Sequence, residues 1–210
     1  MNIFREVMIK EACVESVQQA VMAEKQGAGR IELCSRLDLG GISPPIALVE
    51  EVLQSCDIPV RVMVRPRGGD FVFNRDEIAL MMNYINTCKA TGIEGFVTGA
   101  LTPENQLDIP LIRQLVQEAA PLPVTIHKAI DESTDPLSGI ESLKKIPGVT
   151  HILSSGKADT AIQGSVLLKE MIRAAADDLT ILVAGRVTAQ NLEEVHQLIR
   201  ASEYHGRKIV

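Results

Sequence analysis

Short aliphatic runs alternate with amphipathic stretches along the whole of this 210-residue chain. Aliphatic runs bounded by turn residues indicate buried strands, and apolar residues three and four apart indicate helices. A regular alternation of the two places parallel strands side by side, with the helices packed outside them. The predicted strands cover residues 8–13, 30–34, 59–66, 95–100, 123–129, 150–155, 179–185 and 202–206.

The helices between these strands have recognisable starts and stops. The first is expected over residues 14–27, where Gly27 ends it. Ser43 is expected to cap the second, with Pro44 at its first position, and Asn74 to cap the third. The remaining helices are expected from Asp108 onward, over 136–146, over 164–176, and from a Thr188 cap to residue 199.

Eight strands alternating with helices predict an α/β fold, a TIM-type (β/α)8 barrel of parallel strands. The sequence stops at Val210, so the predicted barrel lacks its last helix and forms a single domain over residues 1–210. An open doubly wound sheet is the alternative, but no GxGxxG turn follows the first strand. The groove left without a helix would expose apolar surface, which a homodimer or higher homo-oligomer would cover.

Composition limits the residue types that can form the core and the classes of binding partner. Aromatic residues make up 3% of the chain and Trp is absent, so the core must be aliphatic. A net charge of −6 without a basic run argues against a nucleic-acid partner. No stretch of 18 apolar residues predicts a membrane span, and the N-terminal segment does not resemble a signal peptide. We therefore expect a cytoplasmic protein with no membrane partner.

Side-chain parity along the strands predicts a cluster of ionisable residues. If Ile31 and Leu33 pack against the helices, Glu32 and Cys34 face the barrel interior. Each predicted member sits near the end of its strand, where characterised TIM-barrel enzymes carry their active sites. The same reasoning selects Glu11, Cys13, Glu32, Cys34, Arg65, His127, Glu203 and His205.

Two interpretations of this cluster stay open. As catalytic groups, Glu11, Glu32, His127 and His205 are candidate acids and bases for a small polar ligand. As structural groups, they would form buried ion pairs, for example between Arg65 and a glutamate. His151 and His196 are expected to have no special role.

Loops after the strands offer candidate anion-binding groups. Arg65 and Arg67 flank a proline and precede two glycines, so guanidinium groups and free backbone amides could bind an anion together. Ser155 and Gly156 after the sixth strand and Gly185 after the seventh are similar candidates. The alternative is that Asp70 and the arginines only brace their loop.

The cysteines suggest a soft metal ion. Cys13 and Cys34 end adjacent strands, which lie roughly 5 Å apart. Two thiolates so placed could hold Cu(I), although two inert buried thiols are the alternative. Cys56 and Cys88 fall late on predicted helices and are interpreted as packing residues.

Several motifs together resemble the CutC family, the copper homeostasis proteins. They are RIELCSRLDLGGISPP, VRPRGGDF, GFVTGALT, VTIHKAID and ILSSGKADTAIQG, and the resemblance extends from Glu11 to His205. It implies a TIM-type barrel, a cytoplasmic location, a link to copper, and dimers or larger assemblies. Family copper binding is associated with cysteines near the start of the chain, which Cys13 and Cys34 match. Lys128 and Ile130 depart from the family's arginine and phenylalanine.

Two functions are therefore predicted. The first is copper homeostasis with Cu(I) bound through Cys13 and Cys34 and no organic cofactor. The second is an enzyme acting on a small anionic metabolite at the C-terminal end of the barrel. There Arg65 and Arg67 would bind the anion, and His127 or a glutamate would move the proton.

Overall fold

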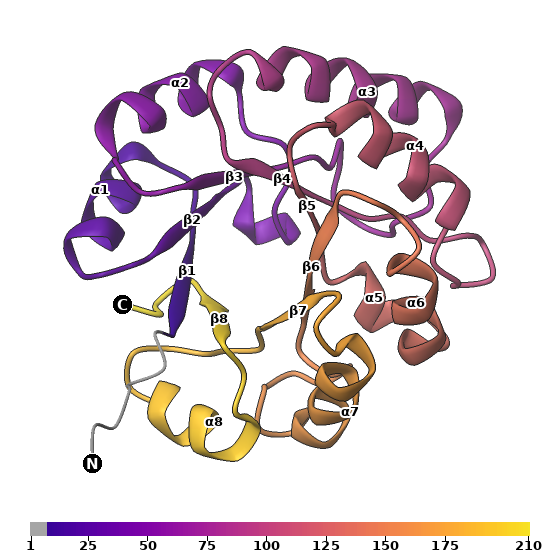
Figure 1. The fold of residues 1–210 in the computed structure, drawn as a ribbon. Coiled ribbons are helices and arrows are strands. Elements are labelled where there is room, and N and C mark those ends of the chain that lie inside the picture. Colours follow the sequence, from indigo (N-terminus) through magenta and orange to yellow (C-terminus); the bar gives the residue numbers. More distant parts are fainter. Residues whose placement is uncertain (1–7) are drawn as a thin grey trace.

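The structure, a computed structural model, describes residues 8–210, so most of the segment compared with signal peptides above lies outside it. Its strands close into one barrel in chain order, and each strand is parallel to both neighbours. The predicted TIM-type barrel is confirmed (Figure 1). The strands are β1 (Ile9–Val14), β2 (Arg30–Leu33), β3 (Val60–Met63), β4 (Gly95–Thr98), β5 (Val124–Ile126), β6 (Val149–Ser154), β7 (Thr180–Val183) and β8 (Glu203–Gly206).

Helices surround this barrel on the outside (Figure 1). No helix follows β8 within the described chain, as predicted. None of the helices between residues 8 and 210 is long and apolar enough to cross a membrane. The helices are α1 (Val17–Lys25), the short η1 (Leu37–Leu39), α2 (Ile46–Ser55), α3 (Arg75–Lys89), α4 (Ile109–Ala119), α5 (Ala129–Glu132), α6 (Pro136–Leu143), α7 (Ser165–Ala175) and α8 (Leu192–Ile199).

Two predicted helix caps are wrong, the first because of a tertiary contact and the second because of a local one. The Ser43 hydroxyl donates to the backbone oxygen of Arg65 and accepts from its amide, so α2 begins later, after Pro45. The Thr188 amide donates to the Asn191 side chain, and α8 begins after Asn191. By contrast, Asn74 and Asp108 accept backbone amides of the first turns of α3 and α4, as predicted.

Several predicted strands extended too far at their C-terminal ends. β5 stops at Ile126, and α5 begins at Ala129 inside the predicted strand. β3 stops at Met63, so Arg65 lies in the following loop. Cys34, Arg65 and His127 therefore sit just beyond their strands, where side chains can turn toward a shared space.

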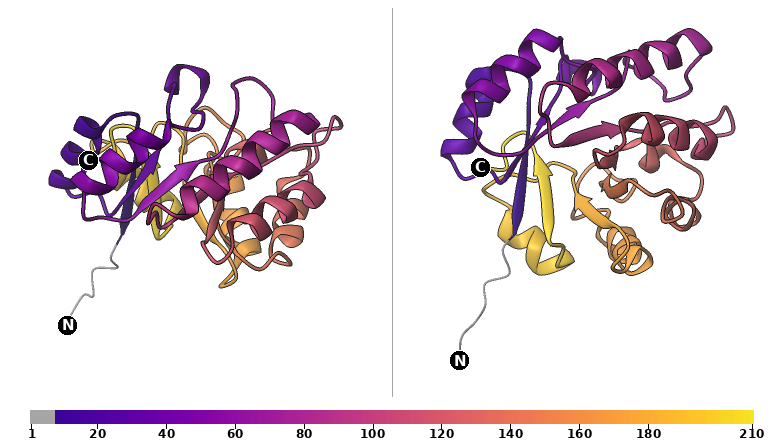
Figure 2. Two further views of the ribbon diagram at one scale, coloured as in Figure 1. Left: turned by 90° about the horizontal axis from the view of Figure 1, so that it is seen from above. Right: turned by 45° about the horizontal axis from the view of Figure 1, so that its top comes forward.

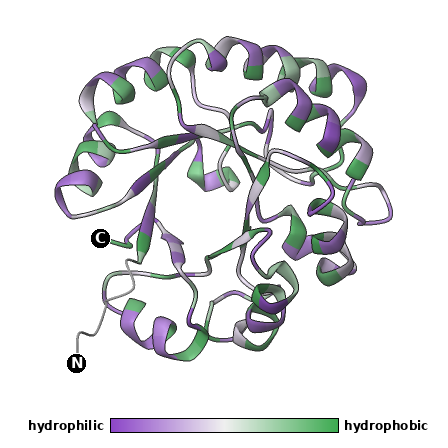
Figure 3. Cartoon of the chain, in the orientation of Figure 1, coloured by the Kyte–Doolittle hydropathy of each residue, from purple (hydrophilic) through white to green (hydrophobic). Residues whose placement is uncertain are grey.

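The main apolar core lies between the barrel wall and the helices. Ile31, Leu33, Val62 and Phe96 are buried on the outward face of their strands. The inward face is different, and Figure 3 shows hydrophilic stretches on β1 and β8. In both views of Figure 2, β1 and β8 run side by side, closing the barrel near the C-terminus of the chain.

Candidate functional site

Inward-facing residues of neighbouring strands lie in register around the barrel. Cys13 is aligned with Glu32, and Glu11 is aligned with Arg30 on one side and with His205 on the other. Pairing of β1 with β8 thus joins residues from the two ends of the chain. The parity prediction for these strands is confirmed.

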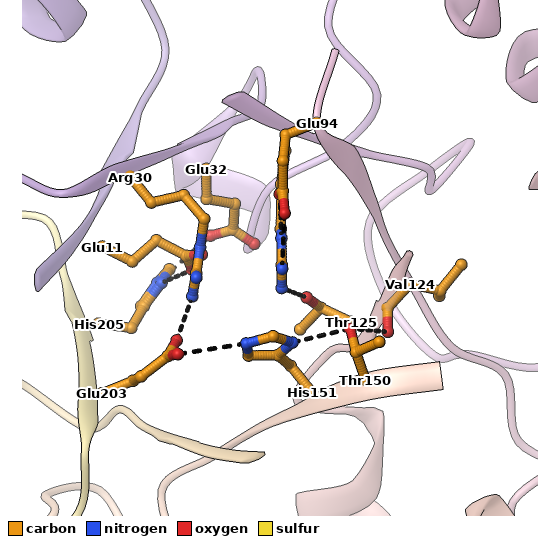
Figure 4. Close-up of polar contacts among 11 residues, drawn as sticks. Glu11, Arg30, Glu32, Glu94, Val124, Thr125, Thr150, His151, Glu203 and His205 are labelled. Atoms are coloured by element: carbon orange, nitrogen blue, oxygen red, sulfur yellow. Dashed lines mark hydrogen bonds and ion pairs between the residues drawn. The ribbon is translucent and has the colours of Figure 1, made fainter. Parts of the chain in front are cut away.

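A buried ion network lies inside the barrel, among the strands (Figure 4). We use that name for Glu11, Arg30, His151, Glu203 and His205. Arg30 donates to Glu11 and, at 2.5 Å, to Glu203. His151 Nε2 lies 3.3 Å from Glu203, and His205 Nδ1 lies 2.9 Å from Glu11.

This network corrects three expectations. Within this network the arginine that pairs with the glutamates is Arg30, whereas the Arg65 side chain makes no ion pair within residues 8–210. His151 was expected to have no special role, but it contacts Glu203. Glu203 opens β8 and so lies at the deep end of the interior instead of the C-terminal end.

The network holds its carboxyl groups ionised. Burial alone would raise the pKa of Glu11, but His205 and Arg30 lower it to about 2. Burial likewise opposes ionisation of Glu203, while His151 and Arg30 lower its pKa. These charged groups form ion pairs with one another, and they stabilise the barrel interior beneath the C-terminal ends of the strands.

A second arginine crosses the interior nearby. Arg61 Nε donates to Glu94 at 2.5 Å, and its Nη1 donates to the Thr125 hydroxyl at 2.7 Å. Sequence reasoning missed Arg30 and Arg61. Arg30 lies two residues before Glu32, and Arg61 lies four residues before Arg65, so each shares the parity of a predicted inward residue.

Above the network, a cavity of about 220 Å³ opens at the C-terminal end of the strands. We call it the mouth cavity. It brings together most of the predicted cluster, while Glu11 and Glu203 lie outside it. Its lining includes Cys13, Glu32, Cys34, Met63, Arg65, Phe71, His127 and His205.

The two predicted metal-binding thiols face each other in this cavity. Cys13 Sγ and Cys34 Sγ are 3.7 Å apart, and the cysteines pack with Met63 and Val97. The Cys34 hydrogen bond, burial and the Glu32 carboxylate raise the pKa of Cys13 well above its usual value. Cys13 is therefore a thiol rather than a thiolate until a cation displaces its proton. Cys88 is buried in the main core, as predicted.

Glu32 and His205 form the polar side of the mouth cavity. His205 Nε2 lies 3.3 Å from Glu32 Oε2, and Glu32 Oε1 has no hydrogen-bond partner among the described residues. Burial raises the pKa of Glu32. Burial opposes protonation of His205, but Glu32 and Glu11 raise its pKa overall. This side thus offers one unsatisfied carboxylate oxygen.

Arg65, Phe71 and His127 form the opposite wall. The Arg65 guanidinium lies 4.4 Å from the Phe71 ring centroid, and the His127 ring lies 4.8 Å from it on centroids. His127 Nδ1 accepts the Ala129 amide at 3.2 Å, which leaves the ring proton on Nε2. Burial, with the Arg65 charge adding to it, lowers the pKa of His127 to about 3. His127 is therefore neutral near pH 7.

Two donors of this wall are unused. Arg65 donates to the backbone oxygens of Leu39, Gly40, Gly41 and Gly69 through its two terminal nitrogens. Its Nε and the His127 Nε2 have no partner within residues 8–210. Buried donors are nearly always satisfied in proteins, so the unused pair indicates a ligand or water.

The other predicted anion-binding residues do not line the mouth cavity. Arg67 is held by Glu77 at 2.5 Å and by Asp70 at 3.0 Å, which braces its loop. The loop after β6 does bind a carboxylate, but it is the chain's own Asp131. Asp131 accepts from the Ser155 amide and hydroxyl, both at 2.9 Å. Gly156 donates to Ser154, and the Gly185 oxygen accepts from Ala161.

Comparison with known proteins gives one consistent result. The sequence model of the CutC family matches residues 8–210. A copper homeostasis protein cutC homolog of Mus musculus is 41% identical over 197 residues, covering 94% of this chain and 72% of that protein. A CutC family protein of Histophilus somni is 37% identical over 195 residues, covering 93% and 80%. A crystal structure of CutC from Streptococcus agalactiae, 31% identical, superposes with a TM-score of 0.91 over 97% of this chain and all of that one.

Proposed function

The chain belongs to the CutC family, and we propose that it serves copper homeostasis by binding Cu(I) between Cys13 and Cys34. The observation that carries this proposal is the 3.7 Å separation of the two sulfur atoms. One ion can contact both at that separation, because metal–thiolate bonds of about 2.3 Å at a tetrahedral angle span a similar distance.

The surroundings of the two thiols fit a soft cation. Met63 packs in the same cluster and adds a thioether, and thiolates and thioethers are the ligands that select Cu(I). Cys13 lines both the mouth cavity and a wider groove between α1 and the end of the chain, so an ion can reach it from outside. Cu(I) is the cargo in this proposal, and it needs no organic cofactor.

Anaerobic competition against a chromophoric Cu(I) chelator tests the proposal. The wild-type protein should take one Cu(I) per chain, and Cys13→Ser or Cys34→Ser should weaken binding at least tenfold. Cys56→Ser is the matched control, since Cys56 lies at the end of α2 away from the cavity. Equal affinity in the double variant Cys13→Ser/Cys34→Ser would refute the thiol site.

The unused donors of Arg65 and His127 favour a second function, an enzyme acting on a small anionic metabolite in the mouth cavity. Arg65 would bind the anion through Nε, and neutral His127 would donate from Nε2. Glu32, whose carboxyl pKa is raised, is the group best suited to carry a proton. Glu11 instead orients His205 from below.

A thermal-shift screen of carboxylated and phosphorylated metabolites tests this second function. A true ligand should raise the melting temperature of the wild type and fail to do so with Arg65→Met. Arg36→Met is the control, because Arg36 is exposed and pairs with Asp38 outside the cavity. If no metabolite stabilises the protein and Cu(I) binds tightly, the enzyme function is refuted and Cu(I) binding remains as the function.

Location and assembly complete the proposal. We place the protein in the cytoplasm, which suits the four free cysteines. We also propose a homo-oligomer, because the wide groove is lined by the exposed Met22 of α1, the end of β1 and residues 205–208, and a second copy of the chain would cover its apolar surface. Light scattering of the purified protein measures the assembly, and a monomer at all concentrations would refute it.

A further inference from the structure

Three different metal-ligating atoms converge in the mouth cavity beside the thiol pair. Cys13 Sγ, a Glu32 carboxylate oxygen and a His205 ring nitrogen all lie within 4.8 Å of one another. All three residues line the mouth cavity, and Glu32 keeps one buried oxygen without a partner in the described chain. A soft ion bound by two thiols uses neither the carboxylate nor the imidazole.

The spacing of these atoms suits a borderline divalent ion. In a tetrahedral zinc site the nitrogen and oxygen ligands are roughly 3.4 Å apart, given bonds of about 2.0–2.2 Å. His205 Nε2 and Glu32 Oε2 are already 3.3 Å apart. The Cys13 sulfur lies within 4.8 Å of both atoms. A sulfur and a nitrogen or oxygen ligand of one tetrahedral zinc are roughly 3.6 Å apart, so a shift of about 1 Å or less completes the set.

His205 is also oriented as a zinc-bound histidine would be. Its Nδ1 lies 2.9 Å from Glu11 Oε1, and Arg30 holds the Glu11 carboxylate from the other side. A carboxylate on one ring nitrogen fixes the tautomer and leaves the other nitrogen free to bind metal. The buried ion network would thus act as the outer shell of a metal site.

We propose that Cys13, Glu32 and His205 bind a divalent transition-metal ion of the Zn²⁺ type, at a site that shares only Cys13 with the Cu(I) site. Binding removes the thiol proton of Cys13 and the proton between His205 Nε2 and Glu32, and it leaves the other His205 proton on Nδ1 against Glu11. Three protein ligands leave the fourth position open, which is typical of catalytic rather than structural zinc. The cavity that these three ligands line also contains Arg65 and His127.

Titration with Zn²⁺ against a chromophoric chelator, under reducing conditions, tests this site. Co²⁺ serves as the spectroscopic probe, since a thiolate ligand gives a charge-transfer band. The wild type should bind one Zn²⁺ per chain and show this band. Glu32→Gln and His205→Gln should each weaken Zn²⁺ at least tenfold and leave Cu(I) affinity unchanged.

Cys34→Ser is the matched control and separates this proposal from the copper proposal. It should lose Cu(I) and keep Zn²⁺ with its Co²⁺–thiolate band, whereas Cys13→Ser should lose both. Circular dichroism melts show whether each variant is folded. If His205→Gln is unfolded, the isosteric Glu32→Gln variant provides the test of the site. Equal Zn²⁺ affinity in wild type and Glu32→Gln, loss of Zn²⁺ in Cys34→Ser, or no Zn²⁺ bound by the wild type would overturn the proposal.

Discussion

At the residue scale, the buried charges of the ion network are stable because each has a partner of opposite sign. Glu11 is 1% exposed and contacts both Arg30 and His205. Removing one partner of such a group leaves the other charge buried and unpaired, which typically costs about 3–5 kcal/mol. The network therefore positions His205 in the mouth cavity, and changing any member should cost a large part of the free energy of unfolding.

Acid should weaken the protein through Glu11. A carboxyl whose pKa falls from 4.5 to about 2 on folding contributes stability that is present above pH 4.5 and is lost as the pH falls toward 2. The free energy of unfolding of wild type minus that of Glu11→Gln should shrink by about 2 kcal/mol between pH 6 and pH 3. Urea unfolding at both pH values measures this.

Glu203→Gln gives the check on this prediction. The pKa of Glu203 is also lowered despite its burial, so the difference from wild type should shrink in the same direction. A difference for Glu11→Gln that stays constant or grows in acid would mean that the carboxylate is not held ionised by His205 and Arg30.

At the scale of elements, one helix start anchors the wall of the site. Asn74 accepts the Asp76 and Glu77 amides, and the Glu77 side chain accepts the Asn74 amide in return. Glu77 also holds Arg67, whose loop carries Phe71 to Arg65 and His127. The cap of α3 thus stabilises a loop that lines the mouth cavity.

Asn74→Ala should lower the free energy of unfolding by about 1 kcal/mol, since an N-cap side chain is lost. Asn83→Ala, at an exposed position of the same helix, should change it by less than about 0.5 kcal/mol. Chemical denaturation of both variants compares them. Equal effects would show that the cap of α3 is not a stabilising contact.

Closure of the barrel at the whole-molecule scale depends on close backbone packing between β8 and the loop after β7. A Cβ atom added at Gly206 would collide with the backbone oxygen of Val187. Gly206 pairs with Ala12 of β1 and directly follows His205. The same approach that closes the barrel therefore also places His205 in the mouth cavity.

Gly206→Ala should lower the free energy of unfolding by roughly 1–3 kcal/mol, because the added methyl group overpacks the closing seam. Gly29→Ala is the control, since a Cβ there would meet no atom closer than 3.5 Å. Thermal and urea unfolding measure both. A Gly206→Ala variant as stable as Gly29→Ala would contradict the close approach.

Much of the candidate site could be predicted because strand parity is local. Cys13, Glu32, Cys34, His127 and His205 were placed correctly in one cavity from the alternation of side chains alone. Side-chain parity does not show how far along the barrel axis a residue lies, so the prediction wrongly placed Glu203 at the C-terminal end of the strands. It also cannot show that Arg67 turns toward Glu77 and that Asp131 occupies the loop at Ser155.

The sequence by itself determined the barrel, its order of elements and the residues that face inward, because periodicity and turn chemistry act within a few residues. Only the tertiary structure decided which inward residues meet. The register of β1 against β2 and β8 places Glu11 under His205, Arg30 between two glutamates, and Cys13 beside Glu32. That register joins strands from opposite ends of the chain, and no local pattern contains it.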